Sequence, residues 1–321
     1  MLELFHDIRD ELKAVENGLR EVVQTNSQLL TETSTHLLNA GGKRLRPALV
    51  LFSAKFQKFE LAKVLPLAVA LELIHMASLV HDDVVDASLT RRGKPTVKAI
   101  WGNGISTHIG SYLFAKSLML IAEYKDIPLI SEVLSDTSVK MCEGEIQQIS
   151  FSFDIHQSLK NYFYRIKRKT ALLIAASAQL GAVACGAPRQ IHLPLRRYGY
   201  NIGMAFQITD DILDMVAEQS KLGKPIGGDL RQGIITLPLI YALACCEKRD
   251  RLVELVCKVD KSEDEVKEAL DLVRNCGAID RSFEIARKFI LKAKAELKAL
   301  PDIPTRVTLS MAADFVGIRK F

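Results

Sequence analysis

The sequence lacks the cysteine spacings of a zinc module and the apolar leader of a secreted protein. Its six cysteines, at positions 142, 185, 245, 246, 257 and 276, include no C-x-x-C pair, and none has a histidine at zinc-ligand spacing. A zinc module and a disulfide framework are therefore disfavoured. The first twenty residues are charged and helix-periodic where a secretory signal needs an apolar stretch. We expect reduced thiols in a cytoplasmic protein.

Proline is scarce, and neither sign of charge dominates. The 321 residues include 10 prolines, 43 Lys or Arg and 38 Asp or Glu, and the net charge of +5 is scattered along the chain. A scattered balance of this kind points to no nucleic-acid partner. Hydrophobic residues make up 48% of the chain, which excludes a disordered protein and suffices for one large core. We expect residues 1–321 to form a single domain.

The periodicity of the apolar residues predicts helices and no strand of useful length. Glycine and proline gather at a few short sites and leave long segments between them. Residues 61–86 are apolar almost all round until the last turn, and residues 198–214 become acidic within their length. Residues 171–187 are nearly uncharged but too short to span a membrane, so we expect a buried helix there. The prediction is an all-α bundle with a peripheral layer and no transmembrane segment.

Two acidic motifs of the form D-D-x-x-D interrupt these apolar segments. The first consists of Asp82, Asp83 and Asp86, and the second of Asp210, Asp211 and Asp214. On a helix, positions i and i+4 share a face, so each motif presents carboxylates together. Acidic groups at the end of an apolar helix need counter-charges, and hard divalent cations with oxygen ligands supply them. Because Mg²⁺ completes its coordination with substrate phosphates, the pair of motifs indicates a site for a diphosphate.

Basic residues suited to such a substrate are present. The stretch G-G-K-R-L-R-P supplies Lys43, Arg44 and Arg46, and Arg91 and Arg92 follow the first acidic motif. Each is by itself more typical of a surface charge, but the set fits the binding of phosphorylated groups. Further candidates are Lys169, Lys224, Arg319 and Lys320.

A series of motifs carries a resemblance to a known family. In order along residues 40–240 stand GGKRLRP, ELIHMASLVHDDVVD, RRGKPT, GEIQQ, KTALL, FQITDDILD and GKPIGGDLRQGIITLP. This succession resembles the trans-isoprenyl diphosphate synthases, which implies an isoprenoid-synthase-type helical bundle with a central cavity. The likeness is strongest to the long-chain members, above all to the catalytic component II of bacterial heptaprenyl diphosphate synthases.

The resemblance implies a role for each matching residue. Asp82, Asp86 and Asp210 would be the metal ligands, with Asp83, Asp211 and Asp214 in support. Isopentenyl diphosphate would be held by Lys43, Arg46, His75 and Arg92, and the allylic diphosphate by Arg91, Lys169 and Lys224. Thr170 and Gln207 would line the developing carbocation. Arg319 and Lys320 would belong to a basic tail that closes over the diphosphates.

The same resemblance implies the reaction and its requirements. The expected activity is Mg²⁺-dependent head-to-tail condensation of isopentenyl diphosphate onto an allylic diphosphate, of the heptaprenyl type for a quinone such as menaquinone. Three Mg²⁺ per site are expected. The expected partner is a small regulatory subunit in a heterodimer, or a second copy in a homodimer. The location would be cytoplasmic, with transient membrane association for product release.

Product length should depend on residues upstream of the first motif. Ala77 and Ser78 are small and lie about one turn before Asp82, and Ile74 lies about one turn earlier, so nothing bulky would stop a growing chain early. Small residues that merely permit close helix packing remain the alternative. One departure from the family pattern is visible: Ser111 stands in G-S-Y-L where an aspartate is usual.

Other functions stay open at this stage. A shorter-chain synthase, making geranylgeranyl or hexaprenyl diphosphate, shares the same motifs, and a non-catalytic partner subunit would tolerate decayed motifs, although both are intact here. A terpene cyclase would replace the second acidic motif by an Asn/Ser/Glu site. A di-iron carboxylate bundle would need two Glu-x-x-His pairs, whereas Glu72 and His75 form one.

Overall fold

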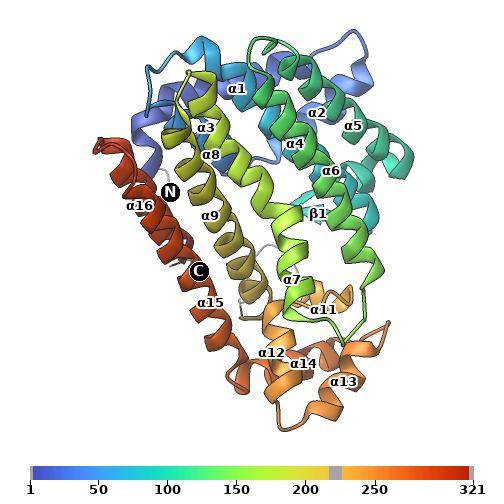
Figure 1. Cartoon of the computed structure of the whole chain (residues 1–321). Coiled ribbons are helices and arrows are strands. Elements are labelled where there is room, and N and C mark those ends of the chain that lie inside the picture. The colour runs from blue at the N-terminus through green and yellow to red at the C-terminus, as the bar shows by residue number, and fades with distance from the viewer. Residues whose placement is uncertain (1–2, 217–225, 318–321) are drawn as a thin grey trace. The chain divides into compact units, whose positions relative to one another are not determined.

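The computed structural model describes residues 3–216 and 226–317, and within them nearly all regular structure is helical (Figure 1). The all-α prediction is therefore confirmed. The first helices are η1 (Glu3–Ile8), α1 (Arg9–Val23), α2 (Gln28–Asn39), α3 (Leu45–Ala54), α4 (Leu61–Val85), α5 (Val97–Ile121), α6 (Pro128–Ser150) and α7 (Leu159–Ile166). They are followed by η2 (Lys167–Ala171), α8 (Leu172–Ala184), α9 (Arg189–Val216), α11 (Gly228–Arg231), α12 (Leu237–Cys245), α13 (Arg249–Cys257), α14 (Glu263–Asn275), α15 (Ala278–Leu297) and α16 (Pro304–Gly317). The strands β1 (Thr90–Arg91) and β2 (Lys94–Pro95) pair as a short antiparallel hairpin.

The described residues fall into two compact units. The first lies within Met1–Ser135, Ala176–Arg196 and Leu297–Leu309, and the second within Asp136–Ala175, Arg197–Glu296 and Ser310–Phe321. The boundaries between the two units fall inside α6, α8, α9, α15 and α16. A single domain over residues 1–321 stays a prediction.

The first unit is built around α4, which packs along α5 and is flanked by α1 and α3 (Figure 1). Because α4 is buried on nearly every face, its sequence is apolar all round rather than amphipathic. Among the described helices, α4 alone is long and apolar enough to cross a membrane by length and composition, and 67% of its most apolar 18-residue window is buried. Burial of that extent is typical of a core helix.

A proline inside α4 is accommodated by a tyrosine of the same unit. Pro66 disturbs the backbone hydrogen bonding of its turn, because proline clashes with the preceding turn and has no N–H. The Tyr124 hydroxyl occupies the gap: it accepts a hydrogen bond from the Leu67 amide at 3.0 Å and donates one to the Lys63 carbonyl at 2.8 Å. The α4 helix therefore continues through the proline to its acidic end.

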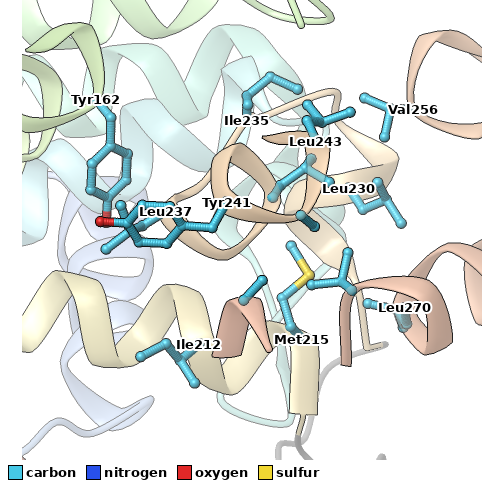
Figure 2. Close-up of a cluster of buried hydrophobic side chains, with 14 of the residues drawn as sticks. Tyr162, Ile212, Met215, Leu230, Ile235, Leu237, Tyr241, Leu243, Val256 and Leu270 are labelled. Carbon is cyan, nitrogen blue, oxygen red and sulfur yellow. The ribbon is translucent and has the colours of Figure 1, made fainter. Parts of the chain in front are cut away.

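The second unit has its own hydrophobic cluster, formed by α7, α9 and α11 to α15 (Figure 2). Ile212 and Met215 of α9 are fully buried in it, on the same helix as the second acidic motif. Figure 2 shows the Tyr162 ring beside Leu237. The apolar face of α9 is thus fixed by packing, which orients the acidic residues between its buried positions. The buried helix expected over residues 171–187 is present as the end of η2 and α8, with most of its side chains in the interior.

Candidate active site

The first acidic motif forms the C-terminal end of α4. Asp83 is 2% exposed, and its Oδ1 accepts hydrogen bonds from Nε and Nη2 of Arg91 at 2.9 and 2.8 Å. Asp82 and Asp86 are partly exposed. The helix stops because Ala87 takes a left-handed conformation (φ 51°), and the Ser88 amide then bonds back to the Asp83 carbonyl at 3.0 Å. The motif therefore ends the helix with one aspartate turned inward and two at the surface.

The arginines that follow the motif lie on the β1–β2 hairpin. Arg92 and Gly93 form its two-residue turn, and both have positive φ, of 54° and 74°. Positive φ at both turn residues matches the twist of a hairpin, although it is costly for arginine. The guanidinium of Arg92 lies against Gly42, where an added Cβ would be 2.8 Å from Nη1. The hairpin thus brings Arg92 to the G-G-K-R loop.

A buried carboxylate lies among these arginines. Glu72 of α4 is 3% exposed and accepts a hydrogen bond from Nη1 of Arg44 at 2.9 Å. Nε of Arg46 is buried and has no hydrogen-bond partner among the described residues. Burial lowers the pKa of Arg46 to about 10, against the opposing effect of Glu72, and Arg92 lowers it further. A buried donor without a partner next to like charges fits a site that takes an anion.

His75 lies one turn after Glu72 on α4. Burial lowers its pKa well below the usual range, and the positive charges of Arg46 and Arg92 lower it further. The imidazole is therefore neutral at neutral pH and meets an anion as a hydrogen-bonding group rather than as a charge.

The depressed pKa of His75 predicts a pH effect on stability. The pKa of His75 is lower in the folded state than in the unfolded state. The neutral imidazole therefore contributes to the free energy of unfolding above the unfolded-state pKa, and this contribution is lost as the pH falls below it. Between pH 7 and pH 5 we expect the wild type to lose at most about 2 kcal/mol relative to His75→Gln. Urea denaturation of both proteins at the two pH values measures this difference. Parallel pH profiles of the two proteins would contradict a lowered pKa for His75. The matched control is His108→Gln, at an exposed histidine of α5.

The second acidic motif lies near the end of α9. Asp211 is buried and bonded on both oxygens: Oδ2 accepts from the Tyr162 hydroxyl at 2.7 Å, and Oδ1 accepts from Nε2 of Gln207 at 2.8 Å. Oε1 of Gln207 in turn accepts from the Thr170 hydroxyl at 2.6 Å. These hydrogen bonds connect Thr170 of η2 to Gln207 and Asp211 of α9, and they fix the rotamers of Thr170 and Gln207. The two residues expected at the carbocation are therefore in direct contact.

Asp214 has a different support. Its two carboxylate oxygens accept hydrogen bonds from the Gly228 and Asp229 amides, each at 3.1 Å, at the start of α11. Burial and then the charge of Asp229 raise the pKa of Asp211 to about 7 and that of Asp214 to about 8. A nearby cation favours the charged form of a carboxyl group, so cation binding would lower both pKa values.

The backbone around Thr170 is a π-helical turn, η2, between α7 and α8. Such turns insert one residue into a helix and occur often at functional sites. Lys169 in this turn pairs with Glu145 of α6, with Nζ 2.7 Å from Oε2. Gly203 allows α9 to approach the turn, because a Cβ there would lie 2.6 Å from Cα of Ala171. This close approach places Gln207, one turn later on α9, against Thr170.

The two motifs share a pattern that the sequence does not reveal. In each, the middle aspartate is buried and bonded to side chains of its own unit, whereas the first and third are partly exposed. Among the described residues, no group of three or more His, Cys, Asp or Glu side chains is gathered closely enough to hold a metal alone. Mg²⁺ commonly takes one or two carboxylates and completes its octahedron with water and substrate phosphates. The partly exposed Asp82, Asp86 and Asp210 fit that mode.

The structure groups the remaining predicted residues within each unit. In the first unit, Arg46, His75 and Arg92 lie near Glu72 and one another. In the second unit, Thr170, Gln207 and Asp211 are joined by hydrogen bonds. Arg91, expected at the allylic diphosphate, is paired with Asp83. Lys43 is exposed in the G-G-K-R loop, directly before Arg44. Lys224, Arg319 and Lys320 lie outside the described residues.

The residues expected to control product length are on α4. Ile74 and Ala77 are 3% and 2% exposed, and the Ser78 hydroxyl donates to the His75 carbonyl at 2.9 Å. Ser111, the departure from the family pattern, is exposed and donates to the Thr107 carbonyl at 3.1 Å. The serine hydroxyl therefore bonds to a backbone carbonyl of its own helix, and the same Thr107 carbonyl lies 3.3 Å from Nε2 of His81, the residue before Asp82.

Sequence reasoning missed three residues of this arrangement. The sequence presents Glu72 as half of a Glu-x-x-His pair, but a single acidic residue in an apolar helix also indicates a buried counter-charge. Glu16 bonds to Arg44 from α1, and Tyr162 bonds to Asp211 from α7. Both partners are distant in sequence, and no local pattern points to them.

Comparison with known proteins gives consistent matches. The sequence model of the family described as polyprenyl synthetase matches residues 27–273. The heptaprenyl diphosphate synthase component 2 of Bacillus subtilis (strain 168) is 42% identical, with coverage of 98% of this chain and 89% of the relative. That of Geobacillus stearothermophilus is 44% identical, with coverage of 99% and 98%. The crystal structure of a polyprenyl synthase from Caulobacter crescentus CB15, complexed with calcium and isoprenyl diphosphate, superposes with a TM-score of 0.95 at 35% identity, with coverage of 99% and 97%.

Proposed function

This chain belongs to the polyprenyl synthetase family and is a prenyltransferase, and we propose that it makes heptaprenyl diphosphate by repeated head-to-tail condensation. The relatives named as heptaprenyl diphosphate synthase component 2 support this product. The product length is inferred from these relatives, and the observation that carries the proposed condensation is the state of the two acidic motifs. Both are intact, and each has its middle aspartate bonded internally and its outer ones partly exposed.

The proposed site has a metal part and two substrate parts. Asp82, Asp86 and Asp210 would hold Mg²⁺, three ions in all, supported by Asp83, Asp211 and Asp214. Lys43, Arg46, His75 and Arg92 would bind isopentenyl diphosphate, and Arg91, Lys169 and Lys224 the allylic diphosphate. Bound Mg²⁺ would supply positive charge to the diphosphate groups. Arg319 and Lys320 would add charge over them.

The residues of this chain would act mainly by charge and position. As the C–O bond of the allylic substrate breaks, its electron pair leaves with the diphosphate, and Lys169 stabilises the developing negative charge. The Thr170 hydroxyl and the Gln207 amide, held by their mutual hydrogen bond, border the allylic cation. The double bond of isopentenyl diphosphate, held at Arg46 and His75, then attacks and forms the C–C bond. Loss of a proton restores the double bond, and the released diphosphate is the proposed acceptor.

The assembly is proposed from the relatives and from the surface. The designation component 2 belongs to proteins of a multi-component synthase, so we propose a heterodimer with a small regulatory subunit, and a homodimer as the second choice. Leu118 and Met119 near the end of α5 are 49% and 66% exposed, and Ile100, before the backbone kink at Gly102, is 49% exposed. Apolar surface of this kind is typical of a face that a subunit covers. The proposed location is cytoplasmic, with brief membrane contact for release of a product used in a quinone such as menaquinone.

One experiment tests product, catalysis and assembly together. The purified chain is incubated with Mg²⁺, isopentenyl diphosphate and each allylic primer, with and without a companion subunit, and the dephosphorylated products are separated by length. We expect long products, with a rise in activity on addition of the companion and a complex larger than one chain by light scattering. Products of geranylgeranyl or hexaprenyl length would favour the shorter-chain alternative. No turnover in any mixture would favour a non-catalytic subunit, and a fully active monomer would exclude both assemblies.

A further inference from the structure

Glu72 is a buried carboxylate shared by several arginines. It lies on the core helix α4, 3% exposed, and Arg44 donates to it at 2.9 Å. Its negative charge also acts on Arg46 and Arg92, where it opposes the lowering of their pKa by burial. Three guanidinium groups so close together repel one another, and a buried anion between them offsets that repulsion.

Arg44 connects this anion to the N-terminal helix. Its Nε bonds to Oε1 of Glu16 on α1, and its Nη2 lies 3.3 Å from Oε2 of the same carboxylate. Its Nη1 donates to Glu72. The planar guanidinium therefore spans two carboxylates on two helices, which a lysine side chain cannot reproduce.

The backbone of Arg44 is as constrained as its side chain. Arg44 precedes the first residue of α3 with a left-handed conformation, φ 48° and ψ 36°. A non-glycine residue persists in this region only where its surroundings hold it. Arg46 lies two residues further on, in the first turn of α3. The ion pairs of Arg44 thus set both the entry into α3 and the place from which Arg46 projects.

We infer that Arg44, held between Glu16 and Glu72, is a positioning residue that orients Arg46 for the diphosphate of isopentenyl diphosphate. The inference rests on the proposed function, because it takes Arg46 and its neighbours as the isopentenyl diphosphate subsite. Of the two arginines in K-R-L-R, one then binds substrate and the other is used inside the protein. Glu16, far from any motif, becomes part of the support of that subsite.

The test separates the ion pairs from the backbone. Glu16→Gln keeps the shape of the side chain and removes its charge. Arg44→Gly keeps the left-handed backbone and removes both ion pairs. The matched control is Glu21→Gln, on the exposed side of the same helix. Isopentenyl diphosphate binding is measured by calorimetry on the full chain with Mg²⁺, followed by steady-state kinetics and thermal melts.

We expect Glu16→Gln to raise the Kd and KM for isopentenyl diphosphate roughly tenfold, with a larger rise for Arg44→Gly. The kcat and the KM for the allylic substrate should stay within about twofold of the wild type, because the rest of the site is unchanged. A lowered melting temperature with an unchanged KM would show a structural role only and overturn the inference. Wild-type affinity for isopentenyl diphosphate in both variants would also overturn the inference.

The outcomes also separate this inference from the proposed function. If the wild-type chain binds no isopentenyl diphosphate, the proposed function fails and this inference fails with it. If the wild type binds and both variants bind equally well, the inference alone fails. Should Arg44→Gly not fold, Glu16→Gln keeps the test decisive, because the Glu16 side chain is 35% exposed and its amide is a small change.

Discussion

Replacing Asp82 or Asp210 by alanine is expected to lower turnover by several orders of magnitude and to leave the helical fold intact. Each substitution removes a proposed metal ligand from a site whose catalysis is charge stabilisation. Both side chains are partly exposed, so their loss leaves no unfilled space in the core. Steady-state kinetics and circular dichroism measure the two effects, and near wild-type turnover in either variant would show that the site is wrongly assigned.

The middle aspartates provide a contrast within the same motifs. Asp83→Ala and Asp211→Ala remove carboxylates that are buried and bonded to Arg91 and Tyr162. The partners would then be left buried without a counter-charge or an acceptor, so stability should fall together with activity. Asp250→Ala, at an aspartate fully exposed on α13, is the neutral control. Four variants that all lost stability equally would contradict the division between outer and middle positions.

Ala77→Phe is expected to shorten the product while preserving the first condensations. Ala77 lies five residues before Asp82, which is about 7 Å along the helix, and Ile74 lies about 12 Å away. A growing chain that passes Ala77 would meet the new ring. Chromatography of the prenyl alcohols after phosphatase treatment gives the length distribution. An active variant with an unchanged distribution would mean that the product does not pass this residue.

The same substitution needs a control for overpacking. Ala77 is 2% exposed, and an aromatic ring inserted into a packed core typically costs about 1–3 kcal/mol. Ala70→Phe, at a fully buried alanine two turns earlier on α4, places the same ring in the core further from the motif. If the two variants melt alike and only Ala77→Phe shortens the product, the change in length comes from position rather than from lost stability.

The helices and the acidic motifs were predictable because their signals are local. An apolar run that becomes acidic at Asp82, and again at Asp210, gives both the helix and the face on which the carboxylates lie. The apolar pattern over residues 61–86 matches α4 to within a residue at its end, whereas α9 begins at Arg189, nine residues before the predicted segment 198–214. What could not be predicted is the partner of each aspartate, because hydrogen-bond partners come from other helices.

The partners of the arginines were likewise not predictable from the sequence. The sequence shows how many arginines lie near the motif. It does not show that Arg44 pairs with Glu72 and Glu16, because these residues come together only in the folded protein. The family pattern places Arg91 on the allylic diphosphate, and the structure shows in addition an ion pair between Arg91 and Asp83. Composition and spacing contain no information on such a pairing, because it depends on how the β1–β2 hairpin turns back toward α4.

The hydrogen bonds of Asp83, Asp211 and Asp214 within the protein bear on whether the chain folds before it binds metal. Each acidic motif would repel itself if all its carboxylates were charged and unsupported, and the protein would then depend on its metal for folding, as small zinc domains do. Here Arg91, Tyr162 and the start of α11 already support these carboxylates. A newly made chain can therefore reach its native state without waiting for divalent ions, and a chelator should stop the enzyme without unfolding it.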